Sequence, residues 1–320
     1  MQMNRIDVHQ HILPPAYAAA LADAGLASAG GVPLPQWSAD AAIAMMDRQG
    51  IAAAITSIST PGVHFGDAAF ARRLARTCNG FSADLASRHP ARFGGFAILP
   101  LPDVDGALAE LDYALDTLRL DGVVLLASNS DGTYLGDPKL DPVLAELDRR
   151  RTVTFVHPTV HPSTGQVPLT IPPFATEFVF DTSRAIANLI WMGAAERYPN
   201  IRFIFSHAGG TAPYLAWRWN LLNTTPRAQE HFPHGFLYYL SRFYYDTALS
   251  GSDYALSALT QLVPSGQILF GSDFPFAPEA VGAAAAKGVE RFGGLSSDDR
   301  QRIWRGNAQM LFPRFVLPHA

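Results

Sequence analysis

The sequence predicts an α/β fold in which eight parallel strands and their helices form a (β/α)8 barrel, or TIM barrel. Eight short apolar segments recur along the 320 residues, and helix-type stretches separate them. Most of these segments are rich in Val, Ile and Phe without alternation, which is typical of parallel strands buried on both faces. Strands that alternate with helices eight times match a barrel better than an open doubly wound sheet or two separate domains.

The predicted strands are, in order, Arg5–His9, Ala53–Ser59, Phe93–Pro100, Gly122–Ala127, Val153–His157, Ile201–His207, Phe243–Thr247 and Ile268–Asp273. No Gly-x-Gly-x-x-Gly turn follows any of them, so a dinucleotide-binding fold has little support. Apolar residues three to four positions apart predict helices between the strands. These helices cover Asp67–Ser87, Val104–Arg119, Pro138–Arg150, Thr182–Arg197, Ala212–Leu222, Ser252–Leu262 and Ser296–Phe312.

Two connections are longer than the roughly 2–6 residues usual between a strand and its helix. His11–Ala39 follows the first strand and contains an Ala-rich stretch typical of a helix, and Pro158–Phe174 follows the fifth strand. Both lie at the carboxyl ends of the strands, where barrel enzymes build active sites. We expect them to form a lid or a pocket wall; the alternative is a decorative surface insertion.

Composition limits the class of protein. Hydrophobic residues make up 48% and charged residues 16%, which predicts a large core, excludes disorder and suits one barrel domain over residues 1–320. A net charge of −4 argues against nucleic acid or an anionic membrane as the main partner. The one cysteine, Cys78, cannot form an internal disulfide and is expected to be a buried helical thiol. The absence of a leader segment or a membrane-length apolar run predicts a soluble cytoplasmic protein.

Histidines concentrate where the predicted strands end. His9 and His11 end the first strand, His157 the fifth and His207 the sixth, and Asp273 ends the eighth. The i, i+2 spacing of His9 and His11 on an extended chain directs both imidazoles to the same side. With His157 and Asp273 they would form a His3Asp set suited to Zn2+ or another divalent transition metal.

A single histidine at a strand end is more often a structural residue than a ligand, but five such residues at one end of four strands indicate a metal site. His207 could be a fifth ligand or an acid/base group, and spacing alone does not separate the two roles. A carboxylate such as Asp273 can both bind a metal and move a proton. Asp246 is expected to orient a neighbouring group, and Asp7 to steady the end of the first strand.

The motifs around these residues resemble the amidohydrolase superfamily, in the branch that contains aminocarboxymuconate-semialdehyde, resorcylate and carboxyvanillate decarboxylases. The matching motifs span nearly the whole chain and are Ile6–Pro14, Phe155–Pro158, Ser206–Gly210, Gly271–Phe276 and Arg305–Ala308. Gly122–Pro138 and Phe178–Leu189 look most like 6-methylsalicylate decarboxylases. The resemblance implies that His9, His11, His157 and Asp273 bind the metal and that His207 is an acid/base residue.

The resemblance also implies a role for Arg218, since an arginine at this place reaches across a dimer interface to the substrate carboxylate. The resemblance therefore implies a homodimer or a dimer-based oligomer; the alternative is that Arg218 is a solvated helix residue. Members with two metals usually carry a carboxylated lysine at the end of the fourth strand. Here the fourth strand ends in Leu125-Leu126-Ala127-Ser128, and neither Lys139 nor Lys287 ends a strand, which predicts a single metal.

Together these features predict a mononuclear metal-dependent, non-oxidative decarboxylase of a small hydroxylated aromatic, salicylate-type acid or a related unsaturated acid. The alternatives are a lactone or amide hydrolase that uses metal-bound water and, more remotely, a non-catalytic metal-binding barrel. Zn2+ is the expected metal, with Mn2+ and Co2+ as alternatives. Phenylalanines expected in or near the carboxyl-end loops would suit an arene, unless they only fill the core: Phe65, Phe174, Phe178, Phe180, Phe274 and Phe276.

Overall fold

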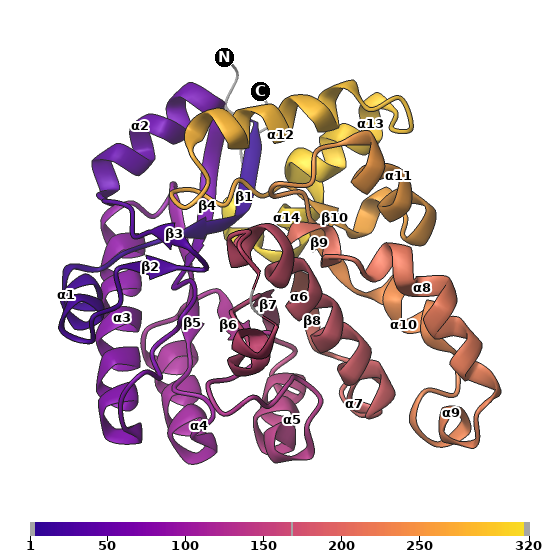
Figure 1. Ribbon diagram of the computed structural model, residues 1–320. Coiled ribbons are helices and arrows are strands. Elements are labelled where there is room, and N and C mark those ends of the chain that lie inside the picture. The colour runs from indigo at the N-terminus through magenta and orange to yellow at the C-terminus, as the bar shows by residue number, and fades with distance from the viewer. Residues whose placement is uncertain (1–3, 168, 317–320) are drawn as a thin grey trace.

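The structure, a computed structural model, describes residues 4–167 and 169–316 and confirms the (β/α)8 barrel. All seven neighbouring pairs in its main sheet are parallel (Figure 1). In sheet order the strands are β1 (Arg5–His11), β4 (Ile51–Ser57), β5 (Phe93–Ile98), β6 (Gly122–Leu126), β7 (Val153–His157), β8 (Arg202–Phe205), β9 (Tyr244–Asp246) and β10 (Ile268–Leu269). Each lies within two or three residues of a predicted strand, apart from β10, which ends four residues early.

The first and last strands meet and close the barrel. The amide of Val8 donates to the Phe270 carbonyl at 3.0 Å, and the amide of His11 donates to the Phe274 carbonyl at 2.8 Å. Between them the Asp273 amide donates to the His9 carbonyl at 2.8 Å. Because these bonds continue beyond the end of β10, the segment that carries Asp273 lies alongside the segment that carries His9.

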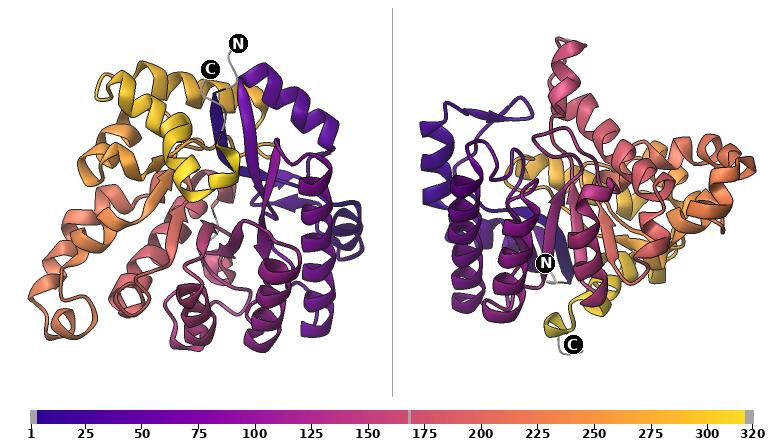
Figure 2. Two further views of the ribbon diagram at one scale, coloured as in Figure 1. Left: turned by 180° about the vertical axis from the view of Figure 1, so that it is seen from behind. Right: turned by 90° about the horizontal axis from the view of Figure 1, so that it is seen from below.

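The helices that follow the strands surround the barrel (Figures 1 and 2). They are α2 (Ala39–Gln49), α3 (Ala68–Arg88), α4 (Val104–Asp112), α5 (Asp141–Arg149), α6 (Pro173–Trp191), α7 (Ala194–Arg197), α8 (Ala212–Asn220), α9 (Pro226–His231), α10 (Phe236–Arg242), α11 (Asp253–Leu262), α12 (Glu279–Arg291), α13 (Ser297–Gln301) and α14 (Asn307–Leu311). None of the helices in the described part of the chain combines the length and apolarity needed to cross a membrane.

The helix predicted at Thr182–Arg197 differs most from the structure. It begins nine residues earlier, at Pro173, and it is divided by Gly193, which adopts a left-handed φ of 73° between α6 and α7. Proline suits the first turn of a helix because the amide it lacks would have no partner there. Phe178 and Phe180, which were expected in or near a loop, therefore lie within α6.

Both long connections contain structure of their own. After β1 the chain forms α1 (Pro15–Asp23) and a two-stranded antiparallel hairpin of β2 (Ser28–Ala29) and β3 (Val32–Pro33). After β7 it forms a short 3-10 helix, Pro162–Gln166, before α6 begins; residue 168 lies outside the described residues. The first turns of α6 project from the body of the barrel (Figure 2).

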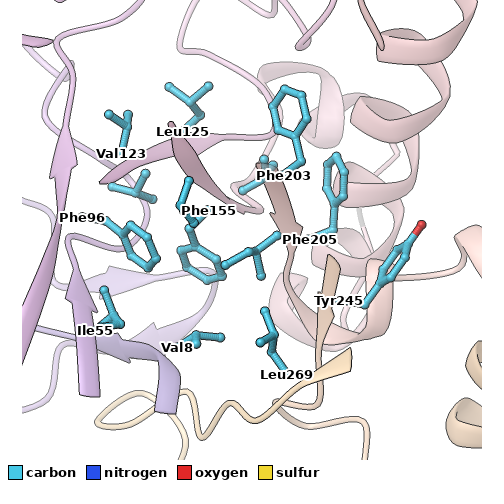
Figure 3. Close-up of a cluster of buried hydrophobic side chains, with 14 of the residues drawn as sticks. Val8, Ile55, Phe96, Val123, Leu125, Phe155, Phe203, Phe205, Tyr245 and Leu269 are labelled. Atoms are coloured by element: carbon cyan, nitrogen blue, oxygen red, sulfur yellow. The ribbon is translucent and has the colours of Figure 1, made fainter. Parts of the chain in front are cut away.

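Buried apolar side chains pack on both sides of the barrel strands. Figure 3 shows part of this core, to which all eight strands contribute: Val8, Ile55, Phe96, Val123, Leu125, Phe155, Phe203, Phe205, Tyr245 and Leu269. Phe96 stacks on Phe155 with ring centroids 5.4 Å apart, and Phe155 meets the His9 ring edge-on at 4.9 Å. The aromatic pair therefore fills the barrel interior directly below the strand ends that carry the histidines.

Cys78 is buried on α3, as predicted, and its burial gives a test of this packing. Burial raises the pKa of its thiol to about 12, so the folded protein holds the neutral and unreactive form. We expect no reaction with a chromogenic disulfide reagent at pH 8 in native conditions and one thiol per chain after denaturation. Rapid reaction of the native protein would contradict the packing of α3 against the barrel.

Candidate metal centre

The predicted metal ligands converge at the carboxyl end of the barrel. One ligand atom from each of His9, His11, His157 and Asp273 lies within 4.8 Å of every other, and all four residues are buried. The Nε2 atoms of His9 and His11 are 3.1 Å apart. Asp273 Oδ1 lies 3.3 Å from the first of these nitrogens and 3.1 Å from the second. Three imidazoles and one carboxylate thus face a common point.

Hydrogen bonds to the opposite ring nitrogens set the tautomer of the three histidines. His9 Nδ1 lies 2.8 Å from Asp246 Oδ2, and His157 Nδ1 lies 2.8 Å from the Pro158 carbonyl oxygen. Both partners are acceptors, so each Nδ1 carries the hydrogen. His11 Nδ1 lies 3.0 Å from the Ser57 hydroxyl, whose own hydrogen is directed to the Gln10 carbonyl. In the neutral form of each ring, Nε2 is therefore the atom with the lone pair.

This arrangement fits a cation. Two Nε2 lone pairs only 3.1 Å apart repel each other unless a positive charge, either a proton or a metal ion, lies between them. The donor set of three imidazole nitrogens and one carboxylate oxygen is the kind that Zn2+ and similar divalent ions prefer. The structure therefore indicates a divalent metal site.

The charges around the site set the protonation of its ligands. Burial alone would raise the pKa of Asp273, but His9, His11 and His207 outweigh it and hold that pKa well below its usual range. Burial and the neighbouring imidazoles lower the pKa of His157 well below its usual value, so this ring is neutral. Burial would also lower the pKa of His9, yet Asp246 and Asp273 raise it to about 10. A metal ion that binds His9 would therefore displace a proton and take over its attraction to the two carboxylates.

Backbone geometry at the strand ends aims these groups. His207, Ala208 and Asp273 adopt left-handed φ angles of 53°, 57° and 62°, which are uncommon outside glycine and cluster at functional sites. The His207 amide donates to Asp246 Oδ1 at 3.0 Å, so one carboxylate holds both His9 and the turn after β8. His207 Nε2 lies 3.4 Å from Asp273 Oδ2, the oxygen that faces away from His9 and His11.

Asp7 steadies the first strand, as predicted. Its Oδ1 accepts from the amides of His9 and Ser272, and its Oδ2 accepts from the Gln10 side chain. Burial raises the pKa of Asp7 to about 6, and the three donors oppose that shift. The carboxylate therefore joins β1 to the segment that carries Asp273.

Two groups that orient the histidines were not predicted from the sequence. Ser57 contacts His11 and the Pro158 carbonyl contacts His157, and no sequence pattern marks either contact. The glycines after His207 allow other parts of the chain to approach closely. Gly209 faces the Tyr245 ring, and Gly210 faces the backbone of Val179 on α6.

Of the six phenylalanines expected near the site, two contact its histidines: Phe178 meets His157 at 6.0 Å between centroids, and Phe276 meets His11 at 5.5 Å. Phe65 packs instead against Tyr17 and Phe70. Arg218 is exposed on α8 and is not part of the cluster.

Comparison with known proteins now gives the family. A model of the Amidohydrolase family matches residues 6–314, nearly the whole chain. The chain belongs to the Amidohydrolase family. It is 35% identical to decarboxylase yanB of Aspergillus niger, over 99% of this chain and 89% of that protein. It is also 35% identical to 6-methylsalicylic acid decarboxylase of Penicillium expansum, over 98% and 97% of the two chains.

A solved structure has the same fold. The dihydroxybenzoic acid decarboxylase from Polaromonas, crystallised with bound manganese and the inhibitor 2-nitroresorcinol, aligns with a TM-score of 0.82 at 24% identity. The alignment covers 98% of this chain and 97% of the other. The predicted resemblance to the decarboxylase branch is confirmed by the family match and by the two relatives that are 35% identical.

The hydrogen bond from His9 to Asp246 can be tested by Asp246→Asn. An amide nitrogen in place of Oδ2 would oppose the His9 Nδ1 hydrogen and favour the tautomer that places hydrogen on Nε2. We expect the affinity for Zn2+ to fall about 10–100-fold, measured by competition with a chromogenic chelator. Asp105→Asn, an exposed change on α4, is the control. Equal affinity in the two variants would show that Asp246 does not set the tautomer.

Proposed function

We propose that this protein is a metal-dependent, non-oxidative decarboxylase of a small hydroxylated aromatic acid of the salicylate type, built on one barrel domain. The observation that carries the proposal is the buried cluster of His9, His11, His157 and Asp273, with His207 next to the free oxygen of Asp273. The 6-methylsalicylic acid decarboxylase that shares 35% of its residues with this chain supports an aromatic acid as substrate. Related unsaturated acids are the broader class.

The site would hold one divalent ion, for which we propose Zn2+, with Mn2+ or Co2+ as alternatives. Three imidazoles suit Zn2+, whereas manganese is bound in the Polaromonas decarboxylase. A single ion is favoured because Lys139 and Lys287, the chain's two lysines, lie in a 3-10 helix and in α12 rather than at strand ends. When bound, the ion supplies positive charge that orients a carboxylate and an adjacent phenol oxygen.

Asp273 and His207 would provide the proton. Asp273 directs Oδ1 to the histidine ligands and Oδ2 to His207 Nε2. A proton can therefore pass between Asp273 Oδ2 and His207 Nε2. His207 Nδ1 is buried and has no hydrogen-bond partner within the described residues. In the proposed reaction this pair protonates the ring carbon that bears the carboxylate, the bond to that carboxylate breaks, and carbon dioxide leaves. No redox step is needed.

The same metal site could activate water for hydrolysis of a lactone or an amide, which is the alternative raised by the sequence. The similar proteins described above are decarboxylases, and they give the hydrolase no support. A barrel that binds metal without catalysis would not need His207 beside Asp273. The decarboxylase is therefore the function that the site supports best.

We also propose that the protein is a homodimer in the cytoplasm and that Arg218 binds the substrate carboxylate in the partner's site. Tyr214 and Trp217 on α8 and Leu221 directly after it are 85%, 69% and 59% exposed, and their spacing places them on one face with Arg218. An exposed apolar stripe of this kind is typical of an interface. Arg218 makes no ion pair or side-chain hydrogen bond with any described residue. A single cysteine suits a reducing compartment.

The proposed reaction predicts release of carbon dioxide from salicylates or resorcylates by metal-loaded protein and its loss on chelation. His207→Asn should lower kcat about 100-fold or more while metal content stays the same. Muconate-type acids, lactones and amides belong in the same panel, with carbon dioxide and ring opening scored separately. Metal-dependent ring opening of a lactone without decarboxylation of any acid would overturn the proposal.

The dimer can be tested by mixing two inactive variants. If Arg218 serves the partner's site, an Arg218→Gln subunit and a His207→Asn subunit together form one intact site per mixed dimer. Refolding an equal mixture should then restore about a quarter of the wild-type activity. No recovery, with sedimentation confirming that mixed dimers form, would place Arg218 outside the partner's site.

A further inference from the structure

The two long connections meet above the metal cluster. The Phe174 amide, at the start of α6, donates to the Gly30 carbonyl at the tip of the β2–β3 hairpin, at 2.9 Å. The next residue of the hairpin, Gly31, packs against Pro172 and Pro173. The β2–β3 hairpin and the start of α6, which are more than 140 residues apart in sequence, therefore form one cover. From this cover α6 continues toward the metal site.

Phe178 is the side chain through which this cover reaches the metal site. It is only 9% exposed, and its ring meets the His157 ring edge-on. The tip of the ring lies against Gly30. A Cβ atom at residue 30 would overlap Phe178 Cζ and lie 2.8 Å from Cε1. The hairpin backbone therefore limits where the Phe178 ring can lie.

Aromatic rings border the metal site on two sides. From the interior of the barrel the site is closed by Phe155, which meets His9 edge-on and stacks on Phe96. From the loops, Phe178 and Phe276 lie against His157 and His11. An aromatic acid that enters from the loops with its carboxylate toward the ligand set would place its ring beside these two side chains.

We propose that Gly30 is a specificity-determining position that acts through Phe178, whose ring forms a wall for the aromatic substrate. Gly30 touches no ligand and is a positioning residue. Because Gly30 has no side chain, the Phe178 ring can occupy the space next to it. The position of that ring sets the width of the site beside His157. The inference rests on the proposed function because it requires a flat aromatic ligand.

Gly30→Ala tests the inference, and Gly25→Ala is its matched control. Both glycines have left-handed φ angles, 57° and 72°, so alanine strains the backbone at either position. A Cβ at residue 25 would meet no atom within 4 Å, whereas a Cβ at residue 30 would displace Phe178. The difference between the two variants is therefore the effect of the contact alone.

The measurement is the Kd of 2-nitroresorcinol and of salicylate on metal-loaded protein, followed by titration calorimetry. We expect Gly30→Ala to weaken binding about tenfold and Gly25→Ala to leave it within about twofold. Phe178→Leu should also weaken binding. In the Phe178→Leu background, Gly30→Ala should have no further effect beyond about twofold, because the ring it displaces is gone.

Equal effects of Gly30→Ala and Gly25→Ala would overturn the inference, and so would an equal effect of Gly30→Ala in both backgrounds. If Gly30→Ala does not fold, Phe178→Leu is compared with Phe180→Leu, a change on the same helix at a residue that is 40% exposed. Unchanged binding in Phe178→Leu would then overturn it.

Turnover is measured separately. Tight binding without decarboxylation by the wild type would contradict the proposed function and leave the inference standing. Failure of the wild type to bind either compound would contradict both.

Discussion

The metal site depends on the position of three hydrogen atoms. Each ligand histidine directs its Nδ1 hydrogen to a fixed acceptor: the Asp246 carboxylate, the Ser57 hydroxyl or the Pro158 carbonyl. These acceptors belong to β9, β4 and the segment after β7, so three different parts of the barrel must be in register. With the hydrogens held there, the three Nε2 atoms face one another, so a cation could bind without rearrangement of the rings.

Asp246 links this constraint to His207, the proposed acid/base residue. One of its oxygens accepts from His9, and the other accepts from the backbone amide of His207. The buried carboxylate thus positions a residue of the metal cluster and the turn that carries His207 at the same time. The left-handed backbone at His207 and Asp273 brings these side chains together although they follow different strands. The metal cluster and His207 are therefore coupled through the fold.

The sequence was sufficient for the barrel and for the ligand set. Parallel strands all present their carboxyl ends at one side, so His9, His11, His157 and Asp273 could be assigned to one site from their places at strand ends alone. The partners of those ligands were harder to find, because a serine on β4 and a backbone carbonyl have no pattern of their own. The start of α6 was also missed, since a Pro-Thr-rich segment suggests a loop. Consequently the place of Phe178 between the hairpin and His157 emerges only from contacts between distant segments.

The seam of the barrel has a consequence for the order in which the protein is made. His9 and His11 leave the ribosome about 260 residues before Asp273 and the strand beside them. Because the seam between β1 and β10 is closed by hydrogen bonds to Phe270 and Phe274, the first strand has no neighbour on that side until those residues have been translated. The complete ligand set therefore cannot form before Asp273 has been translated, and a nascent chain exposes two histidines before their carboxylate partner exists.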